Sequence, residues 1–394
     1  MFFCLALNGL FRAFSFGGDD MNDDDYMRLA LQLAERGCGW TAPNPMVGAV
    51  IVKDGQIIGQ GWHEKYGAPH AERNALAACT RDPAGATIYV TLEPCCHYGK
   101  QPPCTQAILN AGIKRVVVGS RDPNPLVSGN GIQMLREHGV EVPEGVLEDE
   151  CARLNKVFFH YIQTKHPFVV MKYAMTLDGK IAAYTGASKW ITGEAAREHV
   201  QRQRHRYSGI MVGVGTVLTD DPSLACHMEG RKNPVRIICD THLRTPLQAQ
   251  VVMTAGKIPT ILATCCTDLK RCAAYMRAGC RVLCLNCKDG HIDLLQLMEQ
   301  LGQEQIDSIL LEGGGTLNWA ALKSGIVQQV QAYIAPRLFG GKTAKTPVEG
   351  TGVPTPDASF HLKNSRLFKL GEDFLIESEV EYPCSPGSLK KSDG

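Results

Sequence analysis

Apolar and polar positions alternate along most of the chain in runs that predict helices and strands in turn. Residues 23–37 combine an acidic start, apolar residues at helical spacing and Gly37 as a stop, which predicts the first helix. Two β-rich runs within 46–62 meet at Asp54-Gly55, a pair that favours a tight hairpin because both positions tolerate positive φ. A helix over 71–79, a strand over 86–92, a helix over 105–112 and a strand over 115–119 are expected next. This alternation is typical of helices packed on both faces of a sheet.

A second series of the same kind begins after a helix and turn within 149–167, at a new strand in 168–183. Buried strands are expected at 209–214, 235–240, 260–264, 281–285, 308–313 and 330–336, and helices at 194–207, 292–301 and 316–324. The fold class is therefore α/β with two domains, divided near Lys165. We expect domains over 21–165 and 166–382, a disordered or vestigial extension over 1–20 and a flexible tail over 383–394.

Length, charge and cysteine content narrow the class of protein. A chain of 394 residues exceeds what one core usually organises. Its 41 basic and 40 acidic residues nearly cancel, which makes nucleic acid a weak candidate partner. The 16 cysteines are scattered and no convincing export signal precedes them, so reduced thiols in a cytoplasmic protein fit best. No apolar run after the first residues is long enough to span a bilayer, and Met21 could itself be the initiator.

The stretch from residue 69 to 104 holds candidate metal ligands. His70, Cys95 and Cys104 supply one imidazole and two thiolates, and Glu72 adds a carboxylate, which is the inventory of a catalytic zinc site with one open position. His70 and Glu72 share a site only over the first turn of a helix, where Pro69 suits the start. Cys104 opens the next predicted helix, whose positive end favours a thiolate.

Other residues in this stretch compete for these roles. Cys96 rivals Cys95, because adjacent cysteines rarely reach one tetrahedral ion together, and we choose Cys95 because it follows Pro94 as in zinc deaminases. Cys79 is expected to pack as a small apolar residue. Glu93 is expected to be exposed or hydrogen-bonding. The alternative to catalysis is a closed structural site formed by His70, Cys95, Cys104 and one further cysteine.

Zinc with a neighbouring carboxylate suits hydrolytic deamination, because the metal acidifies water and Glu72 carries the proton to a leaving amine. The motifs "TAPNPMVGAVIV", "GWHEKYGAPHAE", "TLEPCCHYGKQPPC" and "DPNPLVSGNGI" resemble the deaminase half of the bifunctional deaminase-reductase family of riboflavin biosynthesis. The wide gap between Cys95 and Cys104 argues against nucleoside and nucleic-acid deaminases, which usually have Cys-x-x-Cys. The resemblance implies a cytidine-deaminase-like α/β/α sandwich. It also implies zinc on His70, Cys95 and Cys104, proton transfer by Glu72 and a pyrimidine contact by Asn44, while Cys96 stands where many relatives have Ser.

The second half carries weaker signals. "LLEGGGTLNWAAL" reads as a buried strand, a Gly-rich turn and a helix whose first amides could receive a phosphate, although such a turn is as often a simple connection. "KYAMTLDGKIA", "SKWITG" and "GVGTVLTDDPSL" likewise contain turns and acids that could be structural. Together they resemble the reductase half of the same family, a dihydrofolate-reductase-like domain, so the resemblance runs from residue 21 to about residue 379.

The resemblance implies two successive reactions on a small phosphoribosylamino-pyrimidine: deamination to the uracil, then reduction of the ribosyl chain to ribityl by NADPH. The NADPH contacts carried over are Ala174, Trp190, Thr216, Asp220, Thr241, Gly314, Gly315, Thr316 and Leu317. The substrate contacts carried over are Ser188, Arg204, Leu224, Glu312 and, in place of the usual Arg, His227. Lys172 is a further candidate catalytic residue of the reductase. Without the family, the basic residues around Arg204 could equally be a solvated helix face.

The leading hypothesis is thus a bifunctional enzyme with one zinc ion per chain and NADPH. The alternatives are a deaminase whose second half no longer reduces, and a zinc-stabilised binding protein. We expect no membrane and no nucleic-acid partner, and a homo-oligomer formed through the reductase domain.

Overall fold

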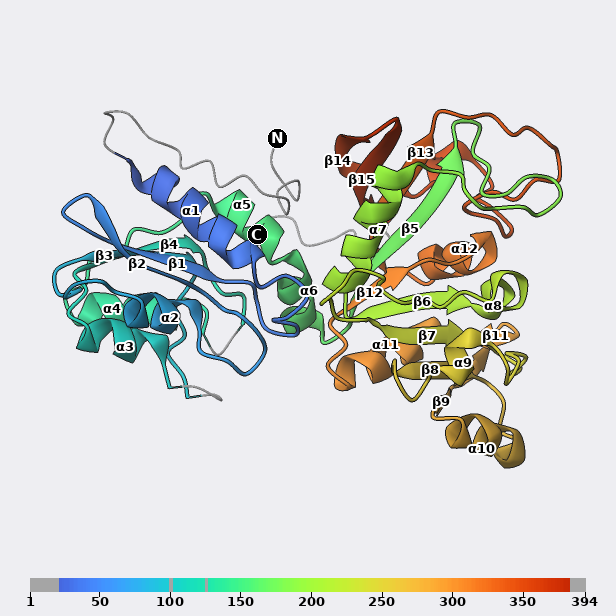
Figure 1. The fold of residues 1–394 in the computed structure, drawn as a ribbon, viewed down its shortest axis with the longest axis horizontal. Coiled ribbons are helices and arrows are strands. Elements are labelled where there is room, and N and C mark those ends of the chain that lie inside the picture. Colours follow the sequence, from blue (N-terminus) through green and yellow to red (C-terminus); the bar gives the residue numbers. More distant parts are fainter. Residues whose placement is uncertain (1–20, 99–101, 125–126, 383–394) are drawn as a thin grey trace, which may run out of the picture.

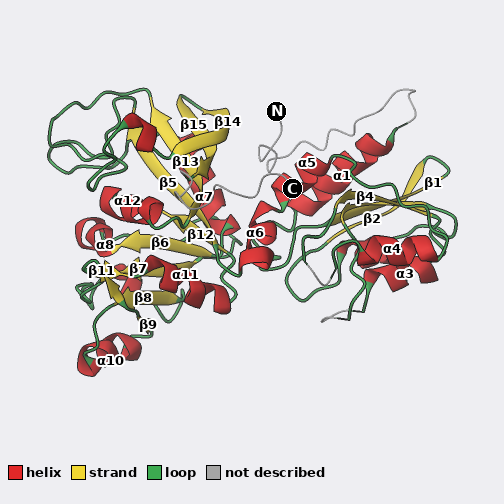
Figure 2. Ribbon diagram, turned by 180° about the vertical axis from the view of Figure 1, so that it is seen from behind, coloured by secondary structure: helices red, strands yellow, loops and turns green. Residues whose placement is uncertain are grey.

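The computed structural model describes residues 21–98, 102–124 and 127–382, and these ranges contain two large sheets, each flanked by helices (Figures 1 and 2). The predictions for 1–20 and for 383–394 lie outside the described residues. The first half of the chain forms one sheet and its helices, and the second half forms the other. Among the helices of the described ranges, none is both long and apolar enough to cross a bilayer.

The first sheet has the order β2-β1-β3-β4, with β3 and β4 parallel and the other pairs antiparallel. Its strands are β1 (Gly48–Lys53), β2 (Gln56–Trp62), β3 (Thr87–Leu92) and β4 (Arg115–Ser120). Its helices are α1 (Asp23–Glu35), α2 (Ala71–Ala77), α3 (Cys104–Asn110), α4 (Asn130–Glu137) and α5 (Glu148–Leu154). Helices α1 and α5 cover one face and α2, α3 and α4 the other (Figure 1). This is an α/β/α sandwich, as expected.

Two local features place the helix that carries His70. Asp54 and Gly55 join β1 to β2 with φ of 51° and 72°, so the predicted hairpin turn is confirmed. Helix α2 packs directly on the backbone of β2, because a Cβ added to Gly61 would lie 2.3 Å from the Ala75 nitrogen. A side chain at residue 61 would therefore push the first turn of α2 away from the sheet.

The second sheet has the order β14-β15-β13-β5-β12-β6-β7-β8-β9, and every pair from β13 to β9 is parallel. Its strands are β5 (Phe168–Thr176), β6 (Gly209–Gly213), β7 (Val235–Cys239), β8 (Thr260–Thr264), β9 (Arg281–Cys284), β12 (Ser308–Leu311), β13 (Val327–Ala335), β14 (His361–Leu370) and β15 (Asp373–Glu381). A separate two-stranded sheet pairs β10 (Cys287–Lys288) with β11 (His291–Ile292), and a 3-10 turn covers Pro356–Ala358.

The helices of this half lie on both faces of its sheet. They are α7 (Glu194–Arg206), α8 (Val214–Asp220), α9 (Gln250–Met253) and α10 (Leu269–Arg277) on one face, and α11 (Leu294–Gln303) and α12 (Gly315–Lys323) on the other. The apolar pattern predicts no strand beyond residue 336, yet β14 and β15 follow it. Side chains of β14 are almost all exposed, so this strand lacks the apolar alternation on which the prediction depends.

Helix α6 (Lys156–Thr164) leads from the first half into β5, which begins at Phe168. The two halves also touch through a seam formed by Gly39 and Trp40 against His205 of α7. The Trp40 and His205 rings meet edge to face at 5.2 Å between centroids. Gly39 has φ of 79°, and a Cβ there would lie 2.5 Å from the His205 ring, so only glycine lets the two halves approach this closely.

Candidate functional site

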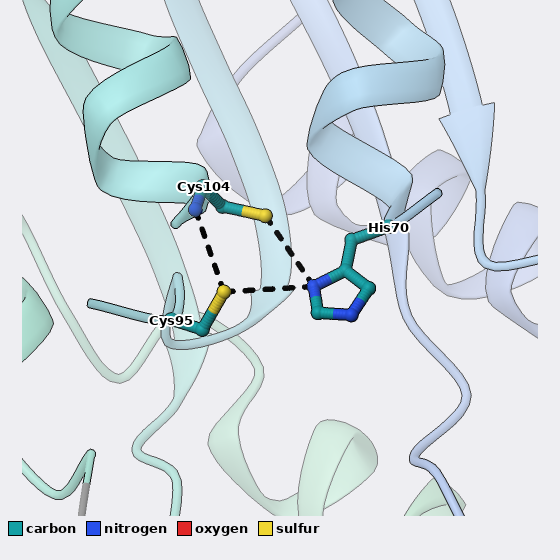
Figure 3. Close-up of side chains that lie close together, drawn as sticks. All are labelled: His70, Cys95 and Cys104. Atoms are coloured by element: carbon teal, nitrogen blue, oxygen red, sulfur yellow. Dashed lines mark hydrogen bonds between the residues drawn. The ribbon is translucent and has the colours of Figure 1, made fainter. Parts of the chain in front are cut away.

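His70, Cys95 and Cys104 come together from three separate segments (Figure 3). His70 is the residue immediately before α2, Cys95 follows β3, and Cys104 is the first residue of α3. The His70 Nδ1 atom lies 3.5 Å from the Cys95 sulfur and 3.4 Å from the Cys104 sulfur. Tetrahedral zinc would hold its nitrogen and sulfur ligands about 3.5 Å apart. The three side chains therefore fit a zinc ion, with Nδ1 as the ligand atom of His70.

Hydrogen bonds join Cys95 to the start of α3. The Cys104 amide donates to the Cys95 sulfur at 3.4 Å, and the Thr105 amide donates to the Cys95 carbonyl oxygen at 3.2 Å. The Cys104 thiol next to it and His70 lower the pKa of Cys95, so that this sulfur is readily ionised. Ionised sulfur is the form that binds a metal.

Glu72 lies in the first turn of α2 and is 3% exposed. Burial raises the pKa of its carboxyl group, while His70 acts in the opposite direction. A carboxylate with a raised pKa is a good proton acceptor, and its place beside the three candidate ligands is the one expected from the spacing of His70 and Glu72.

The competing residues have other places. Within the described ranges, the group of candidate ligand atoms that all lie within 4.8 Å of one another contains Cys95 but not Cys96. Cys79 is partly buried at the end of α2 and its thiol donates to the Ala75 carbonyl oxygen, in keeping with a packing role. Glu93 is hydrogen-bonding rather than exposed: it is 3% exposed and accepts bonds from four backbone N–H groups, those of Asp122, Gly129, Gly131 and Ile132.

Asn44 is held by a histidine that the sequence analysis did not single out. The His63 Nδ1 atom lies 3.1 Å from the Pro69 carbonyl oxygen, and its Nε2 atom lies 3.2 Å from Asn44 Nδ2. A carbonyl oxygen only accepts, so Nδ1 carries the proton and Nε2 accepts from the Asn44 amide. Burial lowers the pKa of His63, which favours this neutral ring. Its position within "GWHEKYGAPHAE" was the available signal.

In the second half, Lys172, Arg204 and Glu312 form one buried ionic group. Arg204 donates to both carboxylate oxygens of Glu312, from Nε at 2.9 Å and from Nη2 at 3.0 Å, and the Lys172 ammonium lies 3.5 Å from Oε2. Burial alone would raise the pKa of Glu312, but Arg204 and Lys172 outweigh it and hold that pKa at about 2. The side chain of Arg204 is 14% exposed, so the alternative of a solvated helix face is wrong for this residue.

Two aromatic side chains, also missed by the sequence analysis, complete the surroundings of Lys172. The Lys172 ammonium lies 5.7 Å from the centre of the Tyr333 ring, and the Tyr333 hydroxyl group is 2.7 Å from His199 Nδ1. Tyr333 is fully buried on β13, the strand beside β5. Nothing in the local sequence marks either residue, because β13 and α7 meet only in the folded chain.

The candidate substrate residues Arg204, Leu224 and His227 lie close together. Arg204 donates through Nη1 to the Ala225 carbonyl oxygen at 3.0 Å, and the His227 amide donates to the Gln201 side chain on α7 at 2.8 Å. His227 is exposed and its Nε2 atom lies 3.1 Å from the Ser223 hydroxyl oxygen. Leu224 is 2% exposed with φ of 51°. Ser188 is half-buried in the loop after β5.

The candidate NADPH residues follow the carboxyl ends of neighbouring parallel strands, the edge at which such sheets bind ligands. Ala174 is on β5, Thr216 and Asp220 are in α8 after β6, Thr241 follows β7, and Gly314, Gly315, Thr316 and Leu317 form the start of α12 after β12. Trp190 is 65% exposed in the loop before α7, and the Arg197 guanidinium lies 4.8 Å from its ring. A Cβ on Gly315 would lie 2.4 Å from the Glu349 side chain, so this turn requires glycine.

Two family models match the chain. The RibD C-terminal domain matches residues 167–376, and the cytidine and deoxycytidylate deaminase zinc-binding region matches residues 20–120. Riboflavin biosynthesis protein RibD of Actinobacillus pleuropneumoniae is 55% identical over 363 residues, which cover 92% of this chain and 96% of that protein. RibD of Aquifex aeolicus is 42% identical and covers 90% of this chain and 97% of its own.

Solved structures agree with these matches. RibD of Acinetobacter baumannii superposes with a TM-score of 0.81 at 37% identity, covering 91% of this chain and 99% of its own. A deaminase/reductase from Thermotoga maritima superposes with a TM-score of 0.78 at 38% identity, covering 91% of this chain and 98% of its own. The predicted pairing of a deaminase-like sandwich with a reductase-like α/β domain is confirmed. The chain belongs to the RibD family, the bifunctional deaminase-reductases of riboflavin biosynthesis.

Proposed function

We propose that this chain deaminates a diaminohydroxyphosphoribosylaminopyrimidine to the corresponding uracil and then reduces the ribosyl chain of the product to ribityl with NADPH. The observation that carries the proposal is the meeting of His70, Cys95 and Cys104 beside the buried Glu72. It is supported by the Thermotoga relative, which is named as the deaminase and reductase of these compounds and which matches both halves.

In the first reaction, His70, Cys95 and Cys104 would hold zinc, which would make a water molecule acidic enough to act as a nucleophile near neutral pH. Glu72 accepts the proton of the attacking water and delivers it to the leaving amine, a transfer favoured by the raised pKa of its buried carboxyl group. Asn44 contacts the pyrimidine. Because its amide NH₂ group donates to His63, its carbonyl oxygen is left to accept a hydrogen bond from a donor on the ring.

In the second reaction, NADPH supplies the hydride when bound along the carboxyl edge of the sheet. Backbone amides of Gly315 and Thr316 at the start of α12 receive a cofactor phosphate, since a helix N-terminus favours anions. Lys172, held by Glu312 at 3.5 Å, hydrogen-bonds the sugar oxygen that gains a proton. Each of the three side-chain nitrogens of Arg204 already donates one hydrogen bond to the protein. Nη1 and Nη2 each carry a second hydrogen, and Arg204 binds the substrate phosphate through these two hydrogens.

The test is incubation of the zinc-loaded protein with the diamino-pyrimidine ribosyl phosphate, with and without NADPH, followed by mass analysis. Without NADPH we expect a product in which one amino group has been replaced by oxygen. With NADPH we expect that product to gain two hydrogens. If the protein deaminates the substrate but oxidises no NADPH, a single-activity deaminase is favoured. If the zinc-loaded protein forms neither product, a zinc-stabilised binding protein is favoured. Light scattering tests the further prediction of a homo-oligomer formed through the reductase half.

A further inference from the structure

Five cysteines lie in or directly after β8, α10, β9 and β10, in the part of the second half at the β9 edge of its sheet. We call them the thiol cluster, and they are Cys265, Cys266, Cys272, Cys284 and Cys287. All five are free thiols, and the proposed deaminase and reductase chemistry uses none of them. Four of the five lie in two pairs. The thiol cluster does not have the spacing of a metal site, because within the described ranges the group that does is His70, Cys95 and Cys104.

The first pair links α10 to β9. The thiol of Cys272, on α10, and the thiol of Cys284, the last residue of β9, both donate to the carbonyl oxygen of Cys266, at 3.7 and 3.5 Å. Burial and then the neighbouring Cys284 thiol raise the pKa of Cys272. Cys272 is 2% exposed whereas Cys284 is exposed, so one member of the pair faces solvent and the other lies directly behind it.

The second pair links the end of β8 to the small β10 and β11 sheet. The Cys265 thiol donates to the Asn286 carbonyl oxygen at 3.6 Å, which places it beside Cys287, the next residue along the chain from Asn286. Cys287 is exposed and Cys265 is half-buried. The arrangement repeats that of the first pair, with an exposed thiol beside a more protected one.

We propose that the thiol cluster is an oxidation site, at which hydrogen peroxide forms one disulfide between Cys272 and Cys284 and another between Cys265 and Cys287. In each pair the sulfur of the exposed cysteine attacks one peroxide oxygen, the O–O bond breaks, and a sulfenic acid and one water are formed. The sulfur of the second cysteine then attacks the sulfenic sulfur, the S–O bond breaks and a second water leaves. Two thiols are thereby oxidised by two electrons, and one peroxide is reduced to two waters.

The chemistry of each pair matches this order of events. Sensor thiols are solvent-accessible and have a resolving cysteine close by, which describes Cys284 and Cys287 with their partners. Burial raises the pKa of Cys265 to about 11 and also raises that of Cys272, which makes these two the resolving rather than the attacking thiols. In a reducing cell both pairs remain thiols until an oxidant appears, as is usual for regulatory disulfides.

The second pair has a direct connection to the loop after β7. The Cys265 amide and the Thr264 hydroxyl group both donate to the Thr241 carbonyl oxygen at 3.1 Å. A bond between Cys265 and Cys287 fixes the backbone that holds Thr241, so oxidation is expected to slow amide exchange in residues 241–245. The consequence for NADPH, which Thr241 contacts in the proposed function, rests on that proposal; the oxidation site does not.

The experiment treats the zinc-loaded full-length protein with dilute hydrogen peroxide, alkylates the remaining thiols and maps disulfide-linked peptides by mass spectrometry. We expect the four paired cysteines to escape alkylation as the two stated disulfides, and dithiothreitol to release them. Peptides with Cys95 and Cys104 are scored separately. Cys284→Ser should remove only the first disulfide and Cys287→Ser only the second; both replace exposed side chains, so folding should be unaffected.

Cys79→Ser is the matched control, because Cys79 is a partly buried thiol outside the cluster, and this variant should keep both disulfides. Thiols that stay fully alkylated after peroxide, that reach only the sulfinic acid, or that form the same mixture of links in every variant would overturn the proposal. Unchanged exchange of residues 241–245 in protein with both disulfides would overturn the connection to Thr241. If the proposed reductase function is wrong, protein with all its thiols reduced does not oxidise NADPH. The disulfide peptide map does not depend on that result, so the two failures can be told apart.

Discussion

Arg204 and Glu312, which are 108 positions apart in the chain, form a bidentate ion pair in which Nε and Nη2 donate to the two carboxylate oxygens at 2.9 and 3.0 Å. The pair joins α7 to the end of β12, and Lys172 on β5 approaches the same carboxylate. The Glu312 carboxylate, which is almost inaccessible to water, therefore links three elements of the second half.

Replacing Glu312 with Gln leaves two buried cations without their partner. We expect the free energy of unfolding at neutral pH to fall by about 3–5 kcal/mol, the usual cost of breaking a buried pair. The pKa of Glu312 is held at about 2, below its ordinary value of 4.5, so its contribution is fully present above about pH 4.5 and is lost as the pH falls toward 2. Urea titrations of zinc-free protein across this range should therefore show a smaller loss for the variant. Glu372→Gln, in an exposed turn, is the control, and an equal acid dependence of wild type and Glu312→Gln would contradict the assignment.

Glu72→Gln tests the proton carrier of the deaminase. The amide cannot accept the proton of the attacking water, so we expect deamination to slow by about 10²–10⁴-fold, while bound zinc and the NADPH-dependent step remain. Rates of product formation and metal analysis are the two measurements. Glu137→Gln, which changes an exposed side chain at the end of α4, should behave as wild type. Near-normal deamination by Glu72→Gln would show that another group carries the proton.

Cys95→Ser and Cys96→Ser separate the two neighbouring candidate ligands. Only the Cys95 sulfur lies with His70 and Cys104, so Cys95→Ser should lower zinc from about one ion per chain to a small fraction of that. Cys96→Ser should keep its zinc. Atomic emission of the dialysed proteins decides the matter, and the opposite pattern would exchange the roles of the two cysteines.

Replacing Glu93 tests how the segment just before Cys95 is anchored to the rest of the first half. Its carboxylate accepts four backbone N–H groups of residues 122–132, so Glu93→Ala leaves several buried donors unpaired. At about 1–3 kcal/mol per unsatisfied group, with some donors rescued by water, we expect a loss of several kcal/mol in the free energy of unfolding. Glu93→Gln keeps one accepting oxygen and should lose less. Equal stability of both variants and wild type, measured by urea denaturation, would rule out this anchoring role.

Local chemistry explains what the sequence could predict. Asp54 and Gly55 predict a turn because few other pairs of residues accept positive φ. His70 and Glu72 can face the same site only at the first turn of a helix. Such features depend on a few adjacent residues. The parallel strands of the second half and its helices α7, α11 and α12 were equally visible, because buried elements carry continuous apolar signals, whereas α8, α9 and α10 were not predicted.

What the sequence could not predict depends on contacts between distant segments. Glu93 looks like any acid after a strand until backbone N–H groups from a distant segment, such as that of Gly129, donate to it, and Arg204 looks like a surface cation until α7 meets Glu312. His63 and Tyr333 acquire roles only through Asn44 and Lys172. The β14 and β15 hairpin is missed for another reason, since an exposed edge needs no apolar pattern.

The seam of Gly39 and Trp40 against His205 has a consequence for how the two activities can be separated. Asn44 of the deaminase lies in the same loop as Trp40, and Arg204 of the reductase directly precedes His205. If the two halves are expressed separately, Trp40 and His205 each lose the ring that they pack against. Independent expression of either half would therefore uncover an aromatic side chain that the intact chain keeps in contact with the other half.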